Sequence, residues 1–325
     1  MPKAIRMYGN GGPEVLKWED DQPGNPKPGE VLVRHEAIGL NFIDVYHRTG
    51  LYPLPSLPAV PGLEGAGFVE AVGEGISEFT AGDRVAYAGV PPGAYAQVRR
   101  IPAHRLVKLP ENISTKTAAA MMLKGMTARY LIRGCYPVKS GDFILLHAAA
   151  GGVGSIVTQW AADIGAVVIG TVGSPEKAEI AKSNGCRFPV LYNQEDFVAK
   201  AREITDGKGV DVVYDSVGKA TFMKSLDCLK PLGMMVSFGQ SSGAVGSFDP
   251  GMLAAKGSLF LTRPSLMTYT EKREDLLNHE KDLFDIVQKG AVTINIGREY
   301  PLAEAAAAHR DLELRRTTGS TLLIP

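Results

Sequence analysis

One segment, from Ile144 to Gly154, constrains the fold of this chain more than any other. An apolar run is followed by a stretch of alanine and glycine and then by a helix-forming sequence. A second apolar run at 167–171 completes a strand, turn, helix and strand within about 30 residues. The turn carries Ala149-x-Gly151-x-x-Gly154, a glycine fingerprint with alanine in its first position. The sequence therefore predicts a nucleotide-binding βαβ unit.

The turn residues suit a pyrophosphate for a physical reason. Small side chains let the backbone approach the ligand, and the N-terminus of the following helix offers free N–H groups and a partial positive charge. We expect Gly151, Gly152 and Val153 to contact the cofactor there. The alternative is a tight turn between a strand and a helix in an unrelated α/β domain.

Bulk properties narrow the function further. A chain of 325 residues favours about two domains. Its formal net charge of zero argues against nucleic acid or an anionic membrane as a partner. No apolar run is long enough to span a bilayer, and the start of the chain does not resemble a signal peptide. The isolated Cys135, Cys186 and Cys228 are typical of reduced thiols, so we expect a cytoplasmic protein.

The predicted secondary structure changes near Ser114. Before it, short strand-like runs separated by Gly- and Pro-rich turns predict a small distorted β-barrel. After it, two helical stretches at 118–123 and 126–131 lead into the nucleotide unit. The strand-like runs of the first part are 4–7, 30–34, 67–72, 84–87 and 95–98.

Strands and helices alternate in the rest of the chain. Together with the first two strands, further runs predict a doubly wound parallel sheet of six strands, with the ligand over their C-terminal ends. A polar helix at 271–289 and a last strand at 319–324 follow, and we expect this tail to fold back on the N-terminal domain. The further strands of the sheet are 189–192, 210–215, 234–239 and 258–262.

The order of the motifs resembles the medium-chain dehydrogenase/reductase superfamily, and within it the zeta-crystallin-like branch of bacterial quinone oxidoreductases. The resemblance implies a GroES-like β-barrel domain (1–124 and 267–325) beside a Rossmann domain (125–266), with the cofactor in the cleft between them. It is carried across the chain by the segments Gly12–Leu16, Gly39–Tyr46, Gly50–Pro53, Pro61–Gly67, Ala81–Val85, His147–Gly154, Tyr214–Gly218 and Phe238–Gly243.

The sequence also predicts that no metal is bound. Zinc-dependent relatives have a cysteine where this chain has Asn41 and a histidine where it has Leu63. A catalytic zinc needs about three N, S or O ligands from the protein, and Glu64 alone cannot hold it. The four closely spaced cysteines of a structural zinc lobe are missing too. His47 and His104 remain, but two scattered histidines do not make a site.

The cofactor is predicted to be NADPH. NAD-binding folds place an acidic residue at the end of the second strand, about 20 positions after the glycines. Here the first carboxylate, Glu176, falls inside the next helix. Ser174 can cap that helix, Pro175 suits its first turn, and Lys177 can face a 2′-phosphate. The alternative is a plain capped helix with a solvated lysine.

Further cofactor contacts follow from the resemblance and from the loops after later strands. The family implies Tyr192 and Arg315 as phosphate neighbours. Arg263 lies in a loop suited to cover the nicotinamide, although it is equally compatible with an ordinary surface arginine. The predicted set is completed by Asn41, Phe42, Thr127, Gly173, Ser216, Val217, Phe238, Gly239, Gln240 and Ser241.

Chemistry without a metal requires a substrate that is already electron-poor. Zinc contributes several kcal/mol to alcohol oxidation, and this chain lacks it. A quinone or an activated enone accepts hydride with modest hydrogen-bond support. Candidate catalytic donors are Asn41, Tyr46 and Tyr52, of which Asn41 fits the nicotinamide ribose better than the substrate. Both tyrosines can instead be packing residues with a hydrogen-bonded tip, and the final proton can come from solvent.

Three functions are therefore open. The leading one is an NADPH:quinone oxidoreductase, and the nearest rival is an NADPH-dependent enone or alkenal double-bond reductase. The third is a non-catalytic nucleotide-binding protein with an RNA-binding or redox-sensing role, which the balanced charge disfavours for RNA. The apolar run Ser258–Thr262 would lie at a sheet edge. Because open edges invite pairing, we expect a homodimer joined there, as in the family.

Overall fold

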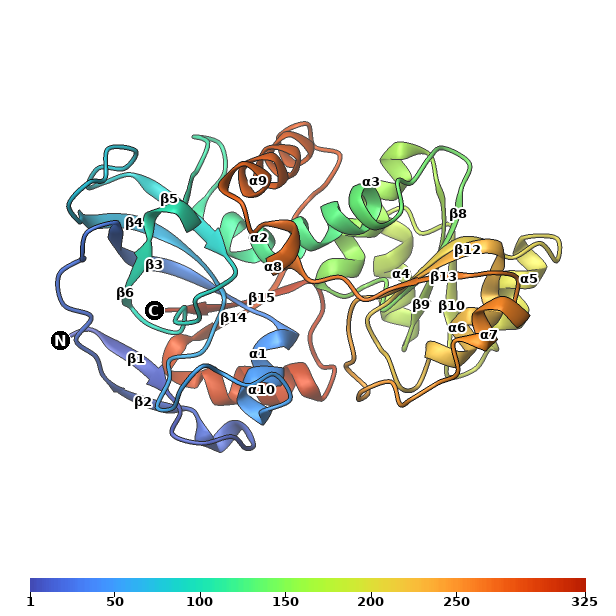
Figure 1. Ribbon diagram of the computed structural model, residues 1–325, viewed down its shortest axis with the longest axis horizontal. Coiled ribbons are helices and arrows are strands. Elements are labelled where there is room, and N and C mark those ends of the chain that lie inside the picture. The colour runs from blue at the N-terminus through green and yellow to red at the C-terminus, as the bar shows by residue number, and fades with distance from the viewer. The chain divides into compact units, whose positions relative to one another are not determined.

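The computed structural model describes residues 1–325, which form two compact units (Figure 1). The first unit contains residues 1–126, 270–288 and 294–325, and the second contains residues 127–269 and 289–293. None of the helices combines the length and the hydropathy that crossing a bilayer requires.

The first unit is built around a curved, mainly antiparallel sheet. Its strands lie in the order β14-β15-β3-β4-β5-β7, with β6 paired to β3, and a separate hairpin joins β1 and β2. β15 pairs with β3, so the tail folds back onto the N-terminal part as predicted. The strands are β1 (Lys3–Arg6), β2 (Lys17–Asp20), β3 (Glu30–Leu40), β4 (Glu64–Val72), β5 (Arg84–Ala88), β6 (Val98–Pro102), β7 (Val107–Lys108), β14 (Ile296–Pro301) and β15 (Ser320–Ile324).

Helices complete this unit and cover its apolar core. Residues in β3 alternate between buried and more exposed over Glu30–Glu36 and are then continuously buried, as expected of a strand that enters the core. The helices are α1 (Phe42–Thr49), α2 (Thr115–Arg129, which ends in the second unit), α9 (Arg273–Gln288) and α10 (Ala305–Glu313), with short turns η1 (Pro13–Val15), η2 (Ala103–Arg105) and η4 (Leu302–Glu304).

The second unit contains the predicted parallel sheet of six strands, in the order β10-β9-β8-β11-β12-β13. Helix α3 packs against β8 and β9, and α6 packs against β11 and β12. The strand order reverses beside β8, so a ligand is expected over the carboxyl ends of β8 and β11. The strands are β8 (Phe143–His147), β9 (Val167–Val172), β10 (Phe188–Leu191), β11 (Val210–Asp215), β12 (Leu229–Ser237) and β13 (Phe260–Thr262).

The helical elements of the second unit connect these strands. A π-helical turn, η3, continues directly from α2, where the sequence predicted only an α-helix. The elements are η3 (Tyr130–Cys135), α3 (Gly152–Ile164), α4 (Pro175–Ser183), α5 (Phe197–Ile204), α6 (Phe222–Cys228), α7 (Gly251–Ala255) and α8 (Leu266–Tyr269).

Some predicted boundaries were wrong. The strand expected at 95–98 overlaps β6 only at Val98, because Tyr95 and Ala96 form isolated bonds and a bridge with β1 instead of a ladder. Helix α3 begins three residues before the predicted Ser155, and β12 begins five residues before Met234.

Candidate cofactor and active site

The turn between β8 and α3 brings its backbone close to the helix. A Cβ on Gly154 would lie 2.2 Å from the carbonyl oxygen of Ala148, so only glycine fits there. Ala148 takes the left-handed conformation with φ of 56°, and its carbonyl accepts from Gly151 N at 2.9 Å. Gly151 precedes the helix without a side-chain cap. The N–H groups at the start of α3, including those of Gly152 and Val153, are therefore available to an anion.

A second polar cluster lies at the end of β9. Ser174 caps α4 as predicted, and its Oγ accepts from Lys177 N at 3.3 Å. A Cβ on Gly173 would lie 2.7 Å from the Tyr192 hydroxyl, which places that hydroxyl directly over the glycine. Asn193, which the sequence did not single out, donates to Gly173 O at 3.1 Å. The structure thus brings Gly173, Ser174, Lys177 and Tyr192 together around one helix start.

Glu176 is not the acidic residue that would repel a phosphate at the end of β9. The residue lies in the first turn of α4 and is exposed. A hydrogen bond from Ser174 lowers the pKa of Glu176. No carboxylate stands at the tip of β9 itself, where the backbone runs from Val172 into Gly173. The cluster is therefore suited to a phosphate more than to a ribose diol.

Asp215 organises the loop after β11, and the sequence did not predict this role. Its fully buried carboxylate accepts from Val217 N at 2.7 Å and from Gly218 N at 3.0 Å. Two hydroxyls complete its shell: Oγ1 of Thr221, the N-cap of α6, at 2.8 Å, and Oγ of Ser225 within α6 at 3.2 Å. The carboxylate therefore fixes the turn that carries two predicted cofactor residues.

The loops after β11 and β12 are joined by backbone hydrogen bonds. Phe238 N donates to Asp215 O at 2.8 Å, and Ser241 N donates to Ser216 O at 3.2 Å. A Cβ on Gly239 would lie 2.5 Å from Ser216 O, so the close approach of the two loops requires glycine. This pairing brings together the predicted residues Ser216, Val217, Phe238, Gly239, Gln240 and Ser241.

Arg263 and Thr127 both lie near Tyr130 in the second unit. Arg263 is exposed, but its Nη1 donates to Ser237 O at 2.7 Å, which ties the β13 loop to the end of β12. Burial raises the pKa of Tyr130, while a hydrogen bond with Thr127 and the charge of Arg263 lower it. Tyr130 stacks on Tyr269 with ring centroids 4.8 Å apart. The predicted Arg315 belongs to the first unit, as do Asn41, Phe42, Tyr46 and Tyr52.

In the first unit, Asn41 precedes α1 and is held from several sides. Its backbone N donates to Asp44 Oδ2 at 2.9 Å. Its side-chain Nδ2 donates to Glu64 Oε2 at 2.7 Å and to Gly39 O at 3.3 Å. Both amide protons are thus used inside the protein, and Oδ1, which also takes part in the capping box with Asp44 N, keeps a lone pair for a ligand. With both protons engaged, this geometry favours an acceptor role for Asn41, such as toward a ribose hydroxyl, over a donor role toward the substrate.

The surroundings of Asn41 do not fit a zinc ion. Glu64 is fully buried and already accepts from Leu123 N at 2.7 Å and from the Lys124 ammonium at 3.1 Å. The side chain of Leu63 is buried and apolar. No group of three His, Cys, Asp or Glu side chains is arranged as metal ligands. An ammonium and an amide N–H face the carboxylate where a metal would need electron-pair donors.

An aromatic row lines α1 and the turn after it. The rings of Phe42 and Tyr46 meet edge to face with centroids 5.3 Å apart, and those of Tyr46 and Tyr52 do so at 5.0 Å. Tyr52 N donates to Tyr46 O at 3.1 Å, which fixes the turn. Phe42 and Tyr52 are half-buried. The row offers apolar ring surface together with two phenolic hydroxyls.

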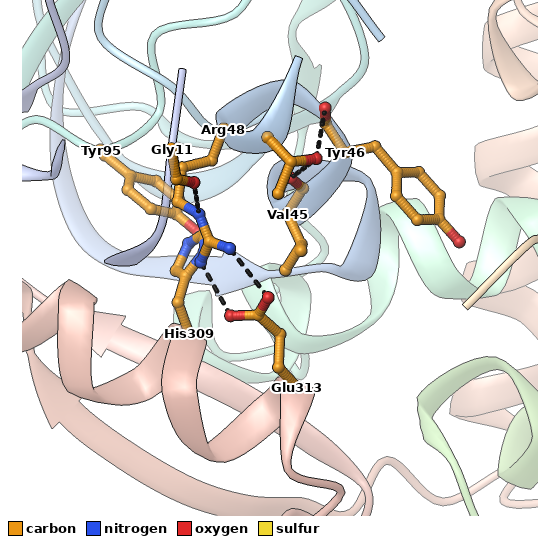
Figure 2. Close-up of polar contacts among 8 residues, drawn as sticks. Gly11, Val45, Tyr46, Arg48, Tyr95, His309 and Glu313 are labelled. Carbon is orange, nitrogen blue, oxygen red and sulfur yellow. Dashed lines mark hydrogen bonds and ion pairs between the residues drawn. The ribbon is translucent and has the colours of Figure 1, made fainter. Parts of the chain in front are cut away.

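Behind α1, a buried arginine ties this helix to α10. Figure 2 shows the Arg48 guanidinium between Gly11, His309 and Glu313, with the Tyr46 ring pointing away from it. Arg48 donates twice to the Glu313 carboxylate, at 2.8 and 2.9 Å, and once to Gly11 O at 3.0 Å. Such bidentate pairing sets both distance and angle, so α1 is oriented by the C-terminal helix.

The same arginine fixes a chain of hydrogen bonds that leads to Asp44. Because Arg48 is donor only, His309 Nδ1 accepts from it at 3.2 Å, and Nε2 carries the ring proton. Nε2 then donates to the Tyr95 hydroxyl at 2.9 Å, and this hydroxyl donates to Asp44 Oδ2 at 3.0 Å. Burial lowers the pKa of His309 to about 3 and raises that of Asp44 to about 7.

Comparison with known proteins decides the family. A zinc-binding dehydrogenase family model matches residues 152–278, and an alcohol dehydrogenase GroES-like domain model matches residues 27–111. A quinone oxidoreductase of Pseudomonas aeruginosa is 50% identical, with 100% of each chain covered. The chain belongs to the zinc-free quinone oxidoreductases of the medium-chain dehydrogenase/reductase superfamily. This membership confirms the resemblance stated from the motifs.

Two further relatives are named for two different activities. The crystal structure of Escherichia coli quinone oxidoreductase complexed with NADPH has a TM-score of 0.98 and 48% identity, covering 99% of this chain and 100% of that one. A 2-haloacrylate reductase of Burkholderia is 46% identical, covering 100% of this chain and 99% of its own length.

Sequence reasoning missed three residues that build the site. Asp215 ends an apolar strand immediately before a Ser-Val-Gly turn, a position that could have been noticed as a loop organiser. Lys124 is the one charged residue within the run Ala118–Met126, which is otherwise apolar or glycine. Asn193 carries no signal in the sequence, because its contact depends on how β10 lies beside β9.

Proposed function

We propose that this chain is an NADPH-dependent quinone oxidoreductase that transfers reducing equivalents to a quinone without a metal ion. The observation that carries this proposal is the cluster of Gly173, Ser174, Lys177 and Tyr192 at the end of β9, where no carboxylate stands. Support comes from the Escherichia coli quinone oxidoreductase, whose crystal structure was solved in complex with NADPH.

The second unit contains groups suited to each part of the dinucleotide. The start of α3 offers N–H groups to the pyrophosphate, and the cluster around Lys177 offers an ammonium and a hydroxyl to the 2′-phosphate. The hydrogen-bonded loops after β11 and β12 bind the remaining part of the dinucleotide. We retain Thr127, Arg263 and Arg315 as proposed contacts at the two ends of the cofactor. When bound, NADPH supplies the hydride.

The first unit supplies the acceptor side of the reaction. Asn41 Oδ1 accepts a hydrogen bond from a ribose hydroxyl, and the aromatic row of Phe42, Tyr46 and Tyr52 packs against a planar substrate. A phenolic hydroxyl from Tyr46 or Tyr52 donates to the substrate oxygen as negative charge develops on it. One such donor contributes roughly 2.7–4 kcal/mol where water is excluded. A quinone needs no stronger activation, because its reduced form delocalises the charge.

A steady-state screen tests this proposal. Quinones are compared as acceptors with NADPH and with NADH as donors, using metal-free enzyme. We expect kcat/KM to be at least tenfold higher with NADPH, because a single phosphate ion pair contributes about 1.4 kcal/mol or more. Preference for NADH, or loss of turnover after chelation of metal ions, would contradict it.

A second candidate, reduction of an activated carbon–carbon double bond, is favoured by one observation. The Burkholderia relative, 46% identical over the whole chain, is named 2-haloacrylate reductase. Its printed substrate is an electron-poor alkene, which accepts hydride by the same logic as a quinone. Side-by-side rates with small quinones, α,β-unsaturated ketones and 2-haloacrylates separate the two activities.

We further propose a cytoplasmic homodimer with two functional domains. The domains are residues 1–124 with 267–325 and residues 125–266. β13 pairs only with β12, and Phe260 on it is 55% exposed, so this edge can extend the sheet across two copies. The free thiols of Cys135, Cys186 and Cys228 suit a reducing compartment. Sedimentation at micromolar concentration tests the dimer.

A further inference from the structure

Lys124 is unusual in its surroundings. It lies in the apolar part of α2, and its side chain is only 7% exposed. Its ammonium pairs with Glu64, whose side chain is 0% exposed. Removing two such charges from water costs more than well-packed apolar residues would, so a buried pair is weak evidence for stability. The contacts of the pair therefore indicate its role better than its contribution to stability does.

The pair is part of a built cluster around the amide of Asn41. Glu64 Oε2 accepts from both Lys124 Nζ and Asn41 Nδ2, while Oε1 accepts from Leu123 N. A Cβ on Gly39 would lie 2.1 Å from Glu64 Oε2, so the carboxylate fills the space that this glycine leaves. Both carboxylate oxygens therefore face N–H donors, which only an ionised carboxylate satisfies completely.

We propose that Lys124 is a positioning residue that fixes the direction of the Asn41 amide through Glu64. Lys124 Nζ and Asn41 Nδ2 share Glu64 Oε2, and this contact holds Nδ2 inward, so that Oδ1 faces a ligand that donates a hydroxyl. This inference rests on the proposed function, in which the hydroxyl belongs to the ribose of NADPH.

The double variant Glu64→Gln/Lys124→Met tests the inference, because it removes both charges and conserves volume. An amide at position 64 has one oxygen and one NH2 group. If its oxygen accepts from Leu123 N, its NH2 meets the NH2 of Asn41, and Asn41 must turn its oxygen inward. We expect the melting temperature to stay within a few degrees of wild type. The Kd for NADPH, measured by isothermal titration calorimetry, should rise about tenfold, because a hydrogen bond is lost and a donor faces a donor.

Two further variants make the test specific. Asn41→Leu removes the acceptor, and we expect the same rise in Kd. Adding Glu64→Gln/Lys124→Met to Asn41→Leu should cause no further rise, because Lys124 acts only through Asn41. Lys116→Met is the matched control. Lys116 lies on the same helix and pairs with Glu299 at 2.8 Å, but both side chains of this pair are exposed to solvent. Its Kd and melting temperature should not change.

The outcomes are distinguishable from failure of the proposed function. If wild type does not bind NADPH, the proposed function fails. If wild type binds NADPH and the folded double variant binds it equally well, Lys124 does not position Asn41. Additive effects in the triple variant, or loss of folding in the double variant, would likewise contradict the inference, because the pair would then act independently of Asn41 or serve stability.

Discussion

The two units build their candidate sites in different ways. In the second unit the proposed ligand groups are mostly backbone N–H groups, brought close by Gly154 in the first turn of α3 and by Gly173 and Gly239 just after β9 and β12. In the first unit they are side chains, held by buried partners from distant parts of the chain such as Glu64, Lys124 and His309. A backbone site depends on local geometry, whereas a side-chain site depends on charge balance. The two should therefore fail in different ways when they are altered.

The largest effect is expected from Gly154→Val. A Cβ at this position would lie 2.2 Å from Ala148 O, which is backbone and cannot move aside cheaply. The turn between β8 and α3 should be displaced, and NADPH binding should be lost beyond detection by calorimetry. The matched control is Gly246→Val, where a Cβ meets nothing within 4 Å. Unchanged affinity in Gly154→Val would show that the backbone site tolerates displacement.

The variant Asp44→Asn should show that the stability of the first unit depends on the protonation of one buried carboxyl group. Burial raises its pKa to about 7. The folded protein then binds this proton where the unfolded chain, with a pKa of about 3.9, does not. Stability contributed by this group is present below pH 4 and falls as pH rises to about 7. Relative to Asp44→Asn, wild type should lose up to about 4 kcal/mol of unfolding free energy between pH 4 and pH 8.

Denaturant unfolding at several pH values measures this difference. Comparison with the variant is needed because burial lowers the pKa of His35 and His309 to about 3, which makes stability rise with pH over about 3 to 6.5. A difference between wild type and variant that does not change with pH would exclude a shifted Asp44.

Lys177→Ala should reduce discrimination between the two cofactors. The ammonium pairs with the 2′-phosphate in the proposed complex, so kcat/KM for NADPH should fall about tenfold while that for NADH stays the same. Lys182→Ala is the control on the same helix, since Lys182 is exposed and pairs with Glu179 at 2.7 Å. An equal decrease for both cofactors would mean that Lys177 does not bind the phosphate.

The smallest effect is expected from Tyr46→Phe. This change removes one donor and keeps the ring contacts with Phe42 and Tyr52. More than about a tenth of kcat should remain, because an auxiliary donor costs little over about 1.4 kcal/mol. Stopped-flow or steady-state rates with a quinone measure it. Complete loss of activity would instead assign the Tyr46 hydroxyl a direct role in proton transfer.

The parallel six-stranded sheet and the turns and helix starts of the candidate site could be predicted from the sequence alone. Strand periodicity and the glycine pattern around Gly151 act over a few residues, so they can be read locally, and the capping of α4 by Ser174 was foreseen for the same reason. The strand predicted at 95–98 shows where local patterns fail, since Tyr95 and Ala96 make only isolated contacts with β1.

The side-chain half of the candidate site could not be predicted from local sequence. Whether Asn41 donates or accepts depends on Glu64 and Lys124, which lie 23 and 83 residues away from it along the chain. Likewise, the link from Asp44 through Tyr95 to His309 spans more than 200 residues. A local pattern carries no information about such partners, because burial and charge pairing exist only once the strands and helices have packed.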